Sequence, residues 1–293
     1  MKRIFALLLF QVITFEASLA AADMVRLEFD FAKSAHGFTA GFADYPQGAE
    51  AFYQLTSSWQ DRPGNLGSAP ALFISGNNHS DDLFMFHKKK IQGLPPSTTV
   101  LLTMELELAS KYPEDSLGVG GSPGEGVTVK VGAVPFEPLA VLDLPSGHFR
   151  MNLDKGDQTT DGTHMTSVGN IAKPEDGTEN YVLLTRHQHG RPFTATTAGD
   201  GSLWLIFGTD SGFEATTALF YSRLTVWINR ADTPHLWVEP KGVTGAVRLI
   251  WNQGTLFSSS TLASSWQMVP APERPYIDSL QFDQRRFWKV VQP

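Results

Sequence analysis

The sequence predicts an all-β protein: a jelly-roll-like two-sheet sandwich followed by a small β-domain. Three observations favour this fold class. Apolar and polar side chains alternate with a period of two in many segments, helical periodicity is almost absent, and turn residues separate the alternating segments. The turn residues include 26 Gly and 18 Pro among 293 residues, and the hydrophobic fraction of 42% is large enough for a packed core.

The clearest alternation marks four strands, and each should bury one face in an antiparallel sheet. These strands are Val25–Phe31, Leu102–Leu108, Val127–Val131 and Leu224–Ile228. Further strands are expected at residues 71–75, 82–86, 148–153, 181–186 and 203–207. Only Ala49–Leu55 is expected to form a short helix.

Residues 1–22 have the features of a signal peptide. Lys2 and Arg3 precede an apolar stretch at Ile4–Phe15, and the small residues Ala20–Ala22 supply a cleavage site. No later run is long and apolar enough to predict a membrane span. The chain contains no cysteine, so it would be exported without disulfides. We therefore expect a bacterial protein that is periplasmic or extracellular.

After the signal peptide, the pattern predicts two domains. Residues 23–229 have the length and strand spacing of one large sandwich, and the polar segment 230–235 is expected to be a linker. Residues 236–293 are expected to form a small second β-domain. Its five short strands are expected at residues 247–251, 254–257, 266–269, 276–278 and 286–290.

Both domains also resemble known groups of proteins. The tail resembles the fibronectin-type or Ig-like accessory modules of secreted bacterial proteins. The motifs that carry this resemblance are Leu249–Trp251, Gly254–Ser259, Thr261–Leu262 with Trp266 and Val269, Pro275–Tyr276, and Arg286–Trp288. The larger domain resembles exported bacterial β-sandwich proteins of unknown function, through Gly41–Pro46, Ser75–Phe84, Gly118–Glu125 and Gly208–Glu214. The resemblances imply architecture and location only.

Charge and composition exclude several classes of function. The formal net charge of −7 does not provide the basic surface that a nucleic-acid binder needs. Without cysteine, thiol catalysis and Cys-type zinc sites are excluded. The segment Gly120–Gly124 matches the G-x-S-x-G motif of serine hydrolases, but a strand rather than a helix is expected after it. His187–His189 could place two imidazoles on one strand face, although a polar strand end is the commoner arrangement. The sequence therefore names no catalytic residue.

Two polar loops next to apolar strands are the candidate ligand sites. Their acids and amides would serve as a calcium site, as a pair of carboxylates for glycoside hydrolysis, or as turn-forming groups. Trp227 is a further candidate, because it lies on the polar phase of its strand and should face away from the core. The candidate ligand-binding residues are Asn77, Asn78, Asp81, Asp82, Asp210, Glu214 and Trp227.

A third loop contains the candidate metal ligands. Asp154, Asp157 and Asp161 lie in a Gly-bearing loop, where carboxylates can gather around calcium. Their spacing does not match an EF-hand. Calcium is thus the one cofactor that the sequence suggests.

The function favoured by these features is exported, non-catalytic binding or surface interaction, with carbohydrate as the suggested ligand. The partner would be a glycan or another cell-surface component. One alternative is a glycan-active hydrolase or lyase that uses the loop carboxylates, and another is a structural component of an extracellular assembly. An exposed aromatic patch would favour binding, whereas two carboxylates about 5–10 Å apart across a cleft would favour the enzyme.

Overall fold

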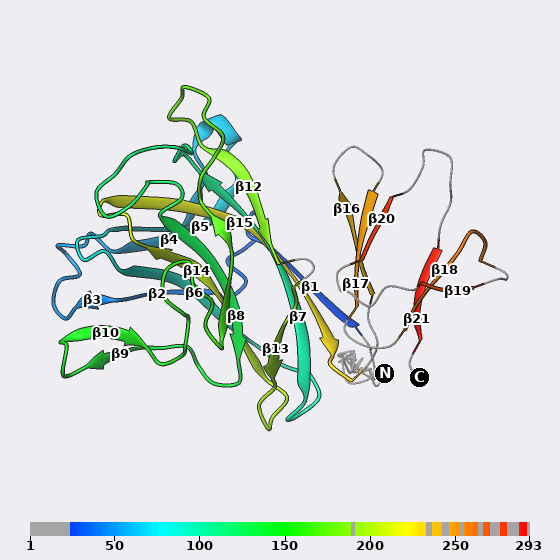
Figure 1. Cartoon of the computed structure of the whole chain (residues 1–293). Coiled ribbons are helices and arrows are strands. Elements are labelled where there is room, and N and C mark those ends of the chain that lie inside the picture. The colour runs from blue at the N-terminus through cyan, green and yellow to red at the C-terminus, as the bar shows by residue number, and fades with distance from the viewer. Residues whose placement is uncertain are drawn as a thin grey trace, which may run out of the picture.

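The computed structural model describes residues 24–188, 191–232, 236–241, 246–251, 255–262, 266–269, 276–279 and 287–291 (Figure 1). The predicted signal peptide lies outside these residues. The described chain consists almost entirely of strands joined by turns, with one short 3-10 helix, η2 (Gly64–Leu66). The predicted all-β sandwich is therefore confirmed. Within the described residues, no helix has the length and apolar character needed to cross a membrane.

The first large sheet has seven strands, all paired antiparallel. Its order is β12-β7-β15-β5-β4, with β1 paired to β15 and β13 paired to β7. The strands are β1 (Met24–Asp30), β4 (Thr56–Asp61), β5 (Pro70–Asn77), β7 (Thr99–Ser110), β12 (Val182–His187), β13 (Phe193–Thr196) and β15 (Thr216–Arg230). The long strand β15 is central, because β5 and β1 share one of its edges and β7 takes the other.

The second large sheet has five antiparallel strands in the order β11-β8-β14-β6-β2. They are β2 (Thr39–Ala43), β6 (Leu83–Ile91), β8 (Val127–Val134), β11 (Met165–Asn170) and β14 (Leu203–Ser211). A small three-stranded sheet accompanies it, formed by β3 (Tyr45–Pro46), β9 (Ala140–Asp143) and β10 (His148–Met151).

The second sheet is buried on both faces. On its inner face, Leu205 and Phe207 pack into the main core against side chains of the first sheet such as Leu102. On its outer face, Phe84 and Phe86 belong to a second apolar cluster that includes Leu153 and is packed by Met151 of β10. Since successive side chains of a strand alternate between faces, this outer cover also buries every second residue of β8 and β14. All eight residues of β8 are buried as a result.

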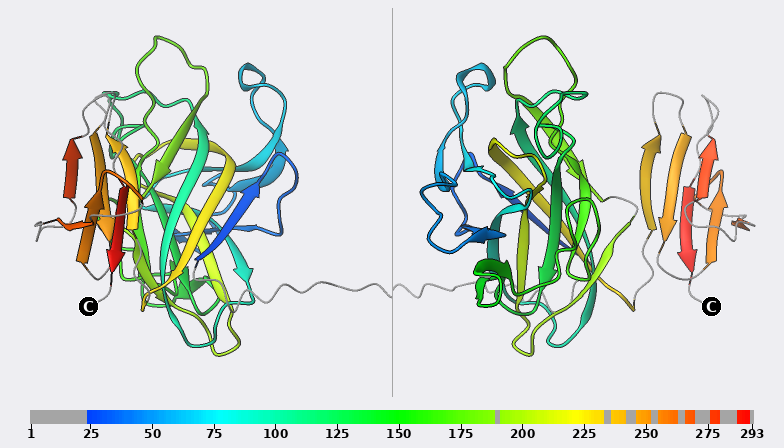
Figure 2. Two further views of the ribbon diagram at one scale, coloured as in Figure 1. Left: turned by 90° about the vertical axis from the view of Figure 1, so that its right-hand side faces the viewer. Right: turned by 60° about the vertical axis from the view of Figure 1, so that its left-hand side comes forward.

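The described residues of the tail form two further antiparallel sheets of three strands each, separate from the strands of the large sheets (Figure 2). The first contains β16 (Leu236–Lys241), β17 (Ala246–Trp251) and β20 (Tyr276–Ser279), and the second contains β18 (Thr255–Ser259), β19 (Gln267–Met268) and β21 (Phe287–Val291). Leu249, Trp251 and Leu256 form their buried cluster. The predicted linker at residues 230–235 begins at Arg230, the last residue of β15, and its residues 233–235 lie outside the described residues. The domain division and the fibronectin/Ig-like class of the tail stay predictions.

The predicted helix at Ala49–Leu55 is wrong, because this segment is a series of turns. The amide of Tyr53 donates to the carbonyl of Ala49 at 2.8 Å, which closes one helical turn. Gln54 then has a positive φ of 50°, so the chain leaves the right-handed helical region at once. Seven residues are too few to sustain a helix without tertiary support.

Candidate functional site

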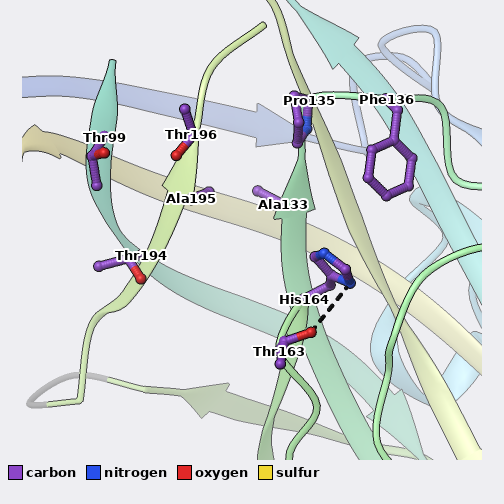
Figure 3. Close-up of a pocket in the computed structure, with 9 residues that line it drawn as sticks. All are labelled: Thr99, Ala133, Pro135, Phe136, Thr163, His164, Thr194, Ala195 and Thr196. Carbon is purple, nitrogen blue, oxygen red and sulfur yellow. Dashed lines mark hydrogen bonds between the residues drawn. The ribbon is translucent and has the colours of Figure 1, made fainter. Parts of the chain in front are cut away.

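A pocket of about 300 Å³ lies where the two large sheets meet at their edges (Figure 3). We call it the inter-sheet pocket. The ends of β7 and β13 form one side, and the end of β8 with the segments around it forms the other. Its lining residues are Thr99, Ala133, Pro135, Phe136, Thr163, His164, Thr194, Ala195 and Thr196.

The lining combines an aromatic ring with hydrogen-bonding groups. Phe136 is 38% exposed, and its ring meets the half-buried His164 edge to face at 5.7 Å between centroids. The Nδ1 atom of His164 accepts the backbone N–H of Asp154 at 2.9 Å. In the neutral ring the proton is therefore on Nε2, which leaves Nε2–H as the donor for a ligand. The pocket thus offers an apolar surface, an imidazole donor and several threonine hydroxyls.

A second pocket of about 260 Å³ lies on the outer face of the second sheet, and we call it the ionic pocket. Four of its lining residues are acids and two are bases. The lining residues are Asp44, Asp82, Arg150, Met151, Leu153, Asp154, Lys155, Gly156 and Asp157. Lys130 of β8 and Asp210 of β14 lie beneath it, on the outer face of the same sheet and with no exposed side-chain surface.

Lys155 is at the centre of the charges. Its Nζ atom lies 2.7 Å from Oδ2 of Asp210, 3.2 Å from Oδ2 of Asp44 and 3.8 Å from Oδ1 of Asp82. Arg150 joins the outer two acids through Nη1, at 2.8 Å from Asp44 and 2.7 Å from Asp82. We call this group the ion cluster. Its six members are Asp44, Asp82, Lys130, Arg150, Lys155 and Asp210.

Burial and mutual interaction set the protonation of the cluster. Burial disfavours the charged form of Lys155, but Asp210 and Asp44 more than compensate and raise the pKa of Lys155 above its ordinary value. Burial also lowers the pKa of Lys130, against the attraction of Asp210. Burial and the neighbouring Asp44 raise the pKa of the Asp82 carboxyl. The hydrogen bond to Asp44 raises the pKa of Arg150.

Residues 154–164, which we call the bridging segment, contribute to both pockets. The Asp154 carboxylate accepts N–H bonds from Gly156 at 3.0 Å and Thr163 at 2.8 Å, and these bonds lower the pKa of Asp154. Gly156 has a positive φ of 71°, and a Cβ there would lie 2.0 Å from the carbonyl oxygen of Thr160. The segment is therefore tightly closed on itself, with Lys155 at the ionic pocket and Thr163 and His164 at the inter-sheet pocket.

The structure brings some of the sequence-predicted residues together. Asp82 and Asp157 line the ionic pocket, and Asp210 lies under it. Asn78 is buried close by, where its Nδ2 donates to the carbonyls of Ser211 at 2.8 Å and Phe213 at 3.1 Å. Asn78 therefore ties two loops together.

The other predicted residues lie elsewhere. The amide of Asn77 donates to the carbonyl of Tyr53, and the exposed Asp81 accepts the side-chain amide of Gln158 on its backbone carbonyl. Glu214 is half-buried. Trp227 is half-buried on the outer face of the first sheet, with the Arg26 guanidinium 5.8 Å from its ring. Neither pocket contains Trp227 in its lining.

The acids that converge differ from the predicted metal ligands. Asp154 binds backbone amides, and Asp161 accepts the N–H of Ser167 at 2.6 Å. Within the part of the chain that the structure describes, Asp44, Asp82 and Asp210 are the group that could hold a metal ion. Each offers an oxygen, and these oxygens lie within 4.8 Å of one another.

Two of the three converging carboxylates are buried and paired with bases. Asp210 and Asp44 are 0% and 3% exposed, and both are paired with basic groups, so Asp82 is the acid of this group that reaches the surface. Ser122 of the G-x-S-x-G motif hydrogen-bonds Glu125 and accepts the amide of Gly124, and β8 follows it. The second histidine of the His187–His189 motif lies outside the described residues.

The residues that sequence reasoning missed are those that depend on long-range contacts. Lys130 occupies the polar phase of Val127–Val131, which predicts a side chain that faces solvent. In the structure the bridging segment covers this side chain, and Lys130 Nζ donates to the carbonyl of Lys155 at 2.7 Å. No pattern in the neighbouring sequence indicates this long-range contact. Phe136 and His164 carry no motif either, because they approach each other only in the fold.

No family model and no curated protein matches this sequence. Several solved structures are similar at low identity. A carbohydrate-binding module of the β-sandwich superfamily has 10% identity and a TM-score of 0.33, over 66% of this chain and 58% of that chain. A module that recognises mannan has 15% identity and a TM-score of 0.31, over 71% of this chain and 99% of its own length. The K1 cleaved adhesin domain of Lys-gingipain from Porphyromonas gingivalis has 12% identity and a TM-score of 0.32, over 70% of this chain and 98% of that domain.

Proposed function

We propose that this chain is an exported, non-catalytic carbohydrate-binding protein that holds a sugar in the inter-sheet pocket. The observation that carries the proposal is the lining of that pocket. A sugar ring has apolar C–H faces and an edge of hydroxyls, so it needs an aromatic surface beside hydrogen-bonding groups. Phe136 supplies the surface, and His164 with the threonines supplies the polar groups.

The size of the pocket limits the ligand. A volume of about 300 Å³ is at the small end of the range for small-molecule sites. It favours a terminal sugar or a short stretch of a glycan, with the rest of the polymer in solvent. The ligand would then be a glycan on a cell surface or in the surroundings of the cell, in line with the signal peptide expected at residues 1–22.

Metal is not part of this proposal. The sequence suggests calcium at Asp154, Asp157 and Asp161. Among the described residues the acids that converge are instead Asp44, Asp82 and Asp210, and the Lys155 ammonium already lies between them. We therefore propose that sugar binding is unchanged by chelation.

A glycan array tests the function directly. The mature protein should bind a limited set of glycans, equally with and without EDTA, and Phe136→Ala should weaken binding at least tenfold because the stacking surface is lost. Leu144→Ala is the matched control: Leu144 is an exposed apolar residue, 82% accessible, that does not line the pocket. Absence of glycan binding by the wild type, or equal loss in both variants, would contradict the proposal.

An assembly role is the second candidate, and exposed apolar side chains favour it. Leu139, Val141 and Leu144 lie in and beside β9 and are 42%, 50% and 82% exposed. Exposed apolar side chains that follow one another along one short segment favour a contact surface. Light scattering would detect self-association, and Val141→Lys should abolish it without changing glycan binding.

A further inference from the structure

The three carboxylates under the ionic pocket have the spacing of a cation site. Calcium binds oxygens at 2.3–2.6 Å, so two oxygens on the same ion lie up to about 5 Å apart. The oxygens of Asp44, Asp82 and Asp210 lie within 4.8 Å of one another. Hard oxygen ligands of this kind favour calcium or magnesium over softer metals.

The ammonium group of Lys155 occupies the position between these oxygens. The Lys155 ammonium lies within 3.8 Å of all three carboxylates, and it is the only base of the cluster that contacts all three. We propose that Lys155 is the built-in cation of this site: its ammonium group replaces a metal ion and fixes the bridging segment onto the second sheet.

The charge balance supports this assignment. Three carboxylates face three bases, Lys155, Arg150 and Lys130, so the cluster is neutral when all six are charged. A divalent ion placed between these carboxylates would lie against the Lys155 ammonium, and the repulsion between like charges is unfavourable in a site where Asp210 and Lys130 are fully buried. A metal ion therefore fits these residues only when the lysine charge is removed.

The backbone around Lys155 turns this ion pairing into a positional constraint. The Lys155 carbonyl accepts from Lys130 Nζ at 2.7 Å, and the Thr160 carbonyl accepts from the same atom at 3.0 Å. The two lysines thus attach the bridging segment to β8 and β14. The same segment supplies Thr163 and His164 to the inter-sheet pocket, so Lys155 acts there as a positioning residue; this last consequence rests on the proposed function.

Metal-dependent thermal unfolding tests the assignment without any glycan. We compare the full-length mature protein with Lys155→Ala and Lys155→Met, each in EDTA, in calcium chloride and in magnesium chloride. Lys155→Met keeps most of the alkyl chain that places Nζ over the Phe84 ring. Lys130→Met is the matched control, because it removes a buried lysine but leaves Lys155 between the acids.

The wild type should melt at the same temperature in all three buffers. Both Lys155 variants should melt roughly 10 °C lower in EDTA, since the three carboxylates lose the one base that they share and the cluster keeps an unbalanced negative charge. Millimolar calcium should recover part of that loss, and calorimetric titration with calcium chloride should show one bound ion in Lys155→Ala. Lys130→Met should be destabilised without a calcium response.

Two results would overturn the assignment. One is a calcium-dependent rise in the melting temperature of the wild type, which would show that the acids bind metal in spite of Lys155. The other is a folded Lys155 variant that neither binds nor responds to calcium or magnesium. If the Lys155 variants do not fold, the wild-type measurement still decides. A failed glycan array alone would contradict only the proposed function.

Discussion

His87 of β6 should make the stability of the sandwich depend on pH. His87 is 2% exposed and lies in the core between the sheets. The centroid of its ring is 5.5 Å from the ring centroids of both Phe207 and Tyr221. Its Nδ1 has no hydrogen-bond partner among the described residues. Burial lowers the pKa of His87 from 6.5 to about 3. The folded state therefore favours the neutral imidazole.

The sign and size of the effect follow from linkage. Because the pKa of His87 is lower in the folded state, the neutral ring contributes stability that is fully present above pH 6.5, its pKa in the unfolded chain. This stability is lost as the pH falls toward about 3, its pKa in the folded protein. Within this window the unfolded state binds one proton more, and stability falls by about 1.4 kcal/mol per pH unit. Between about pH 8 and about pH 5 the loss from His87 alone is about 2 kcal/mol, and this figure barely changes if the folded pKa is one unit higher.

Urea unfolding at about pH 8 and at about pH 5 measures this loss of stability, with fluorescence of the seven tryptophans as the signal. In His87→Leu the loss between the two pH values should be smaller than in the wild type by about 2 kcal/mol. Ile206→Val, which removes one methylene from the buried outer face of β14, is the control and should lower stability by about 1 kcal/mol at both pH values. If His87→Leu differs from the wild type equally at both pH values, the imidazole is not held neutral by burial, and the reasoning is refuted.

Three further predictions concern the ion cluster and the bridging segment. Asp210→Asn should lower the free energy of unfolding by about 3–5 kcal/mol, because two buried lysines lose their shared carboxylate; a change below about 1 kcal/mol in urea unfolding would contradict this. Gly156→Ala should destabilise the fold by more than Gly48→Ala. Both glycines have a positive φ, but only at Gly156 would an added Cβ collide, 2.0 Å from a backbone oxygen. Equal midpoints of urea unfolding for the two variants would contradict the tight closure of the bridging segment. Since the pKa of Asp154 is lowered below 3.8 in the folded state, its carboxylate stabilises the fold above pH 3.8, and this stabilisation is lost as the pH falls through the lower pKa of the folded state. Hydrogen exchange of the Gly156 and Thr163 amides, which donate to this carboxylate, should therefore accelerate in this pH range. In Asp154→Asn the same amides should exchange fast already at neutral pH.

The strands were predictable from the sequence where one face is apolar and the other polar. All nine predicted strands of the large domain occur, among them β7, whose predicted core Leu102–Leu108 is extended at both ends to Thr99–Ser110. The strands without such alternation were missed. β4 is exposed along its whole length, and β11 contains Gly169 at a register shift, so neither shows an apolar face. Their strand conformation comes from pairing with β5 and β8, which is a tertiary effect.

The candidate site was less predictable because its two halves lie far apart in the sequence. Asp82 and Asp210 are acids beside apolar strands, a pattern visible in the sequence, and both belong to the ion cluster. The bases that neutralise them come from β8 and from residues 150–155, and no local pattern joins these segments. The sequence therefore points to calcium at Asp154, Asp157 and Asp161, in the segment that contributes the cation Lys155.

The form of the cluster explains why charged groups occur where an apolar contact would suffice. A buried ion pair adds little net stability compared with a well-packed apolar pair, because both charges lose their hydration. Its geometric requirement is strict, since a lysine that shifts by one position along the segment loses its contact with all three carboxylates and leaves the cluster one positive charge short. The outer apolar cluster around Leu153 would tolerate such a slip, because apolar contacts are not directional. The ion cluster selects one register of the bridging segment on the second sheet, and that register places His164 beside Phe136 in the inter-sheet pocket.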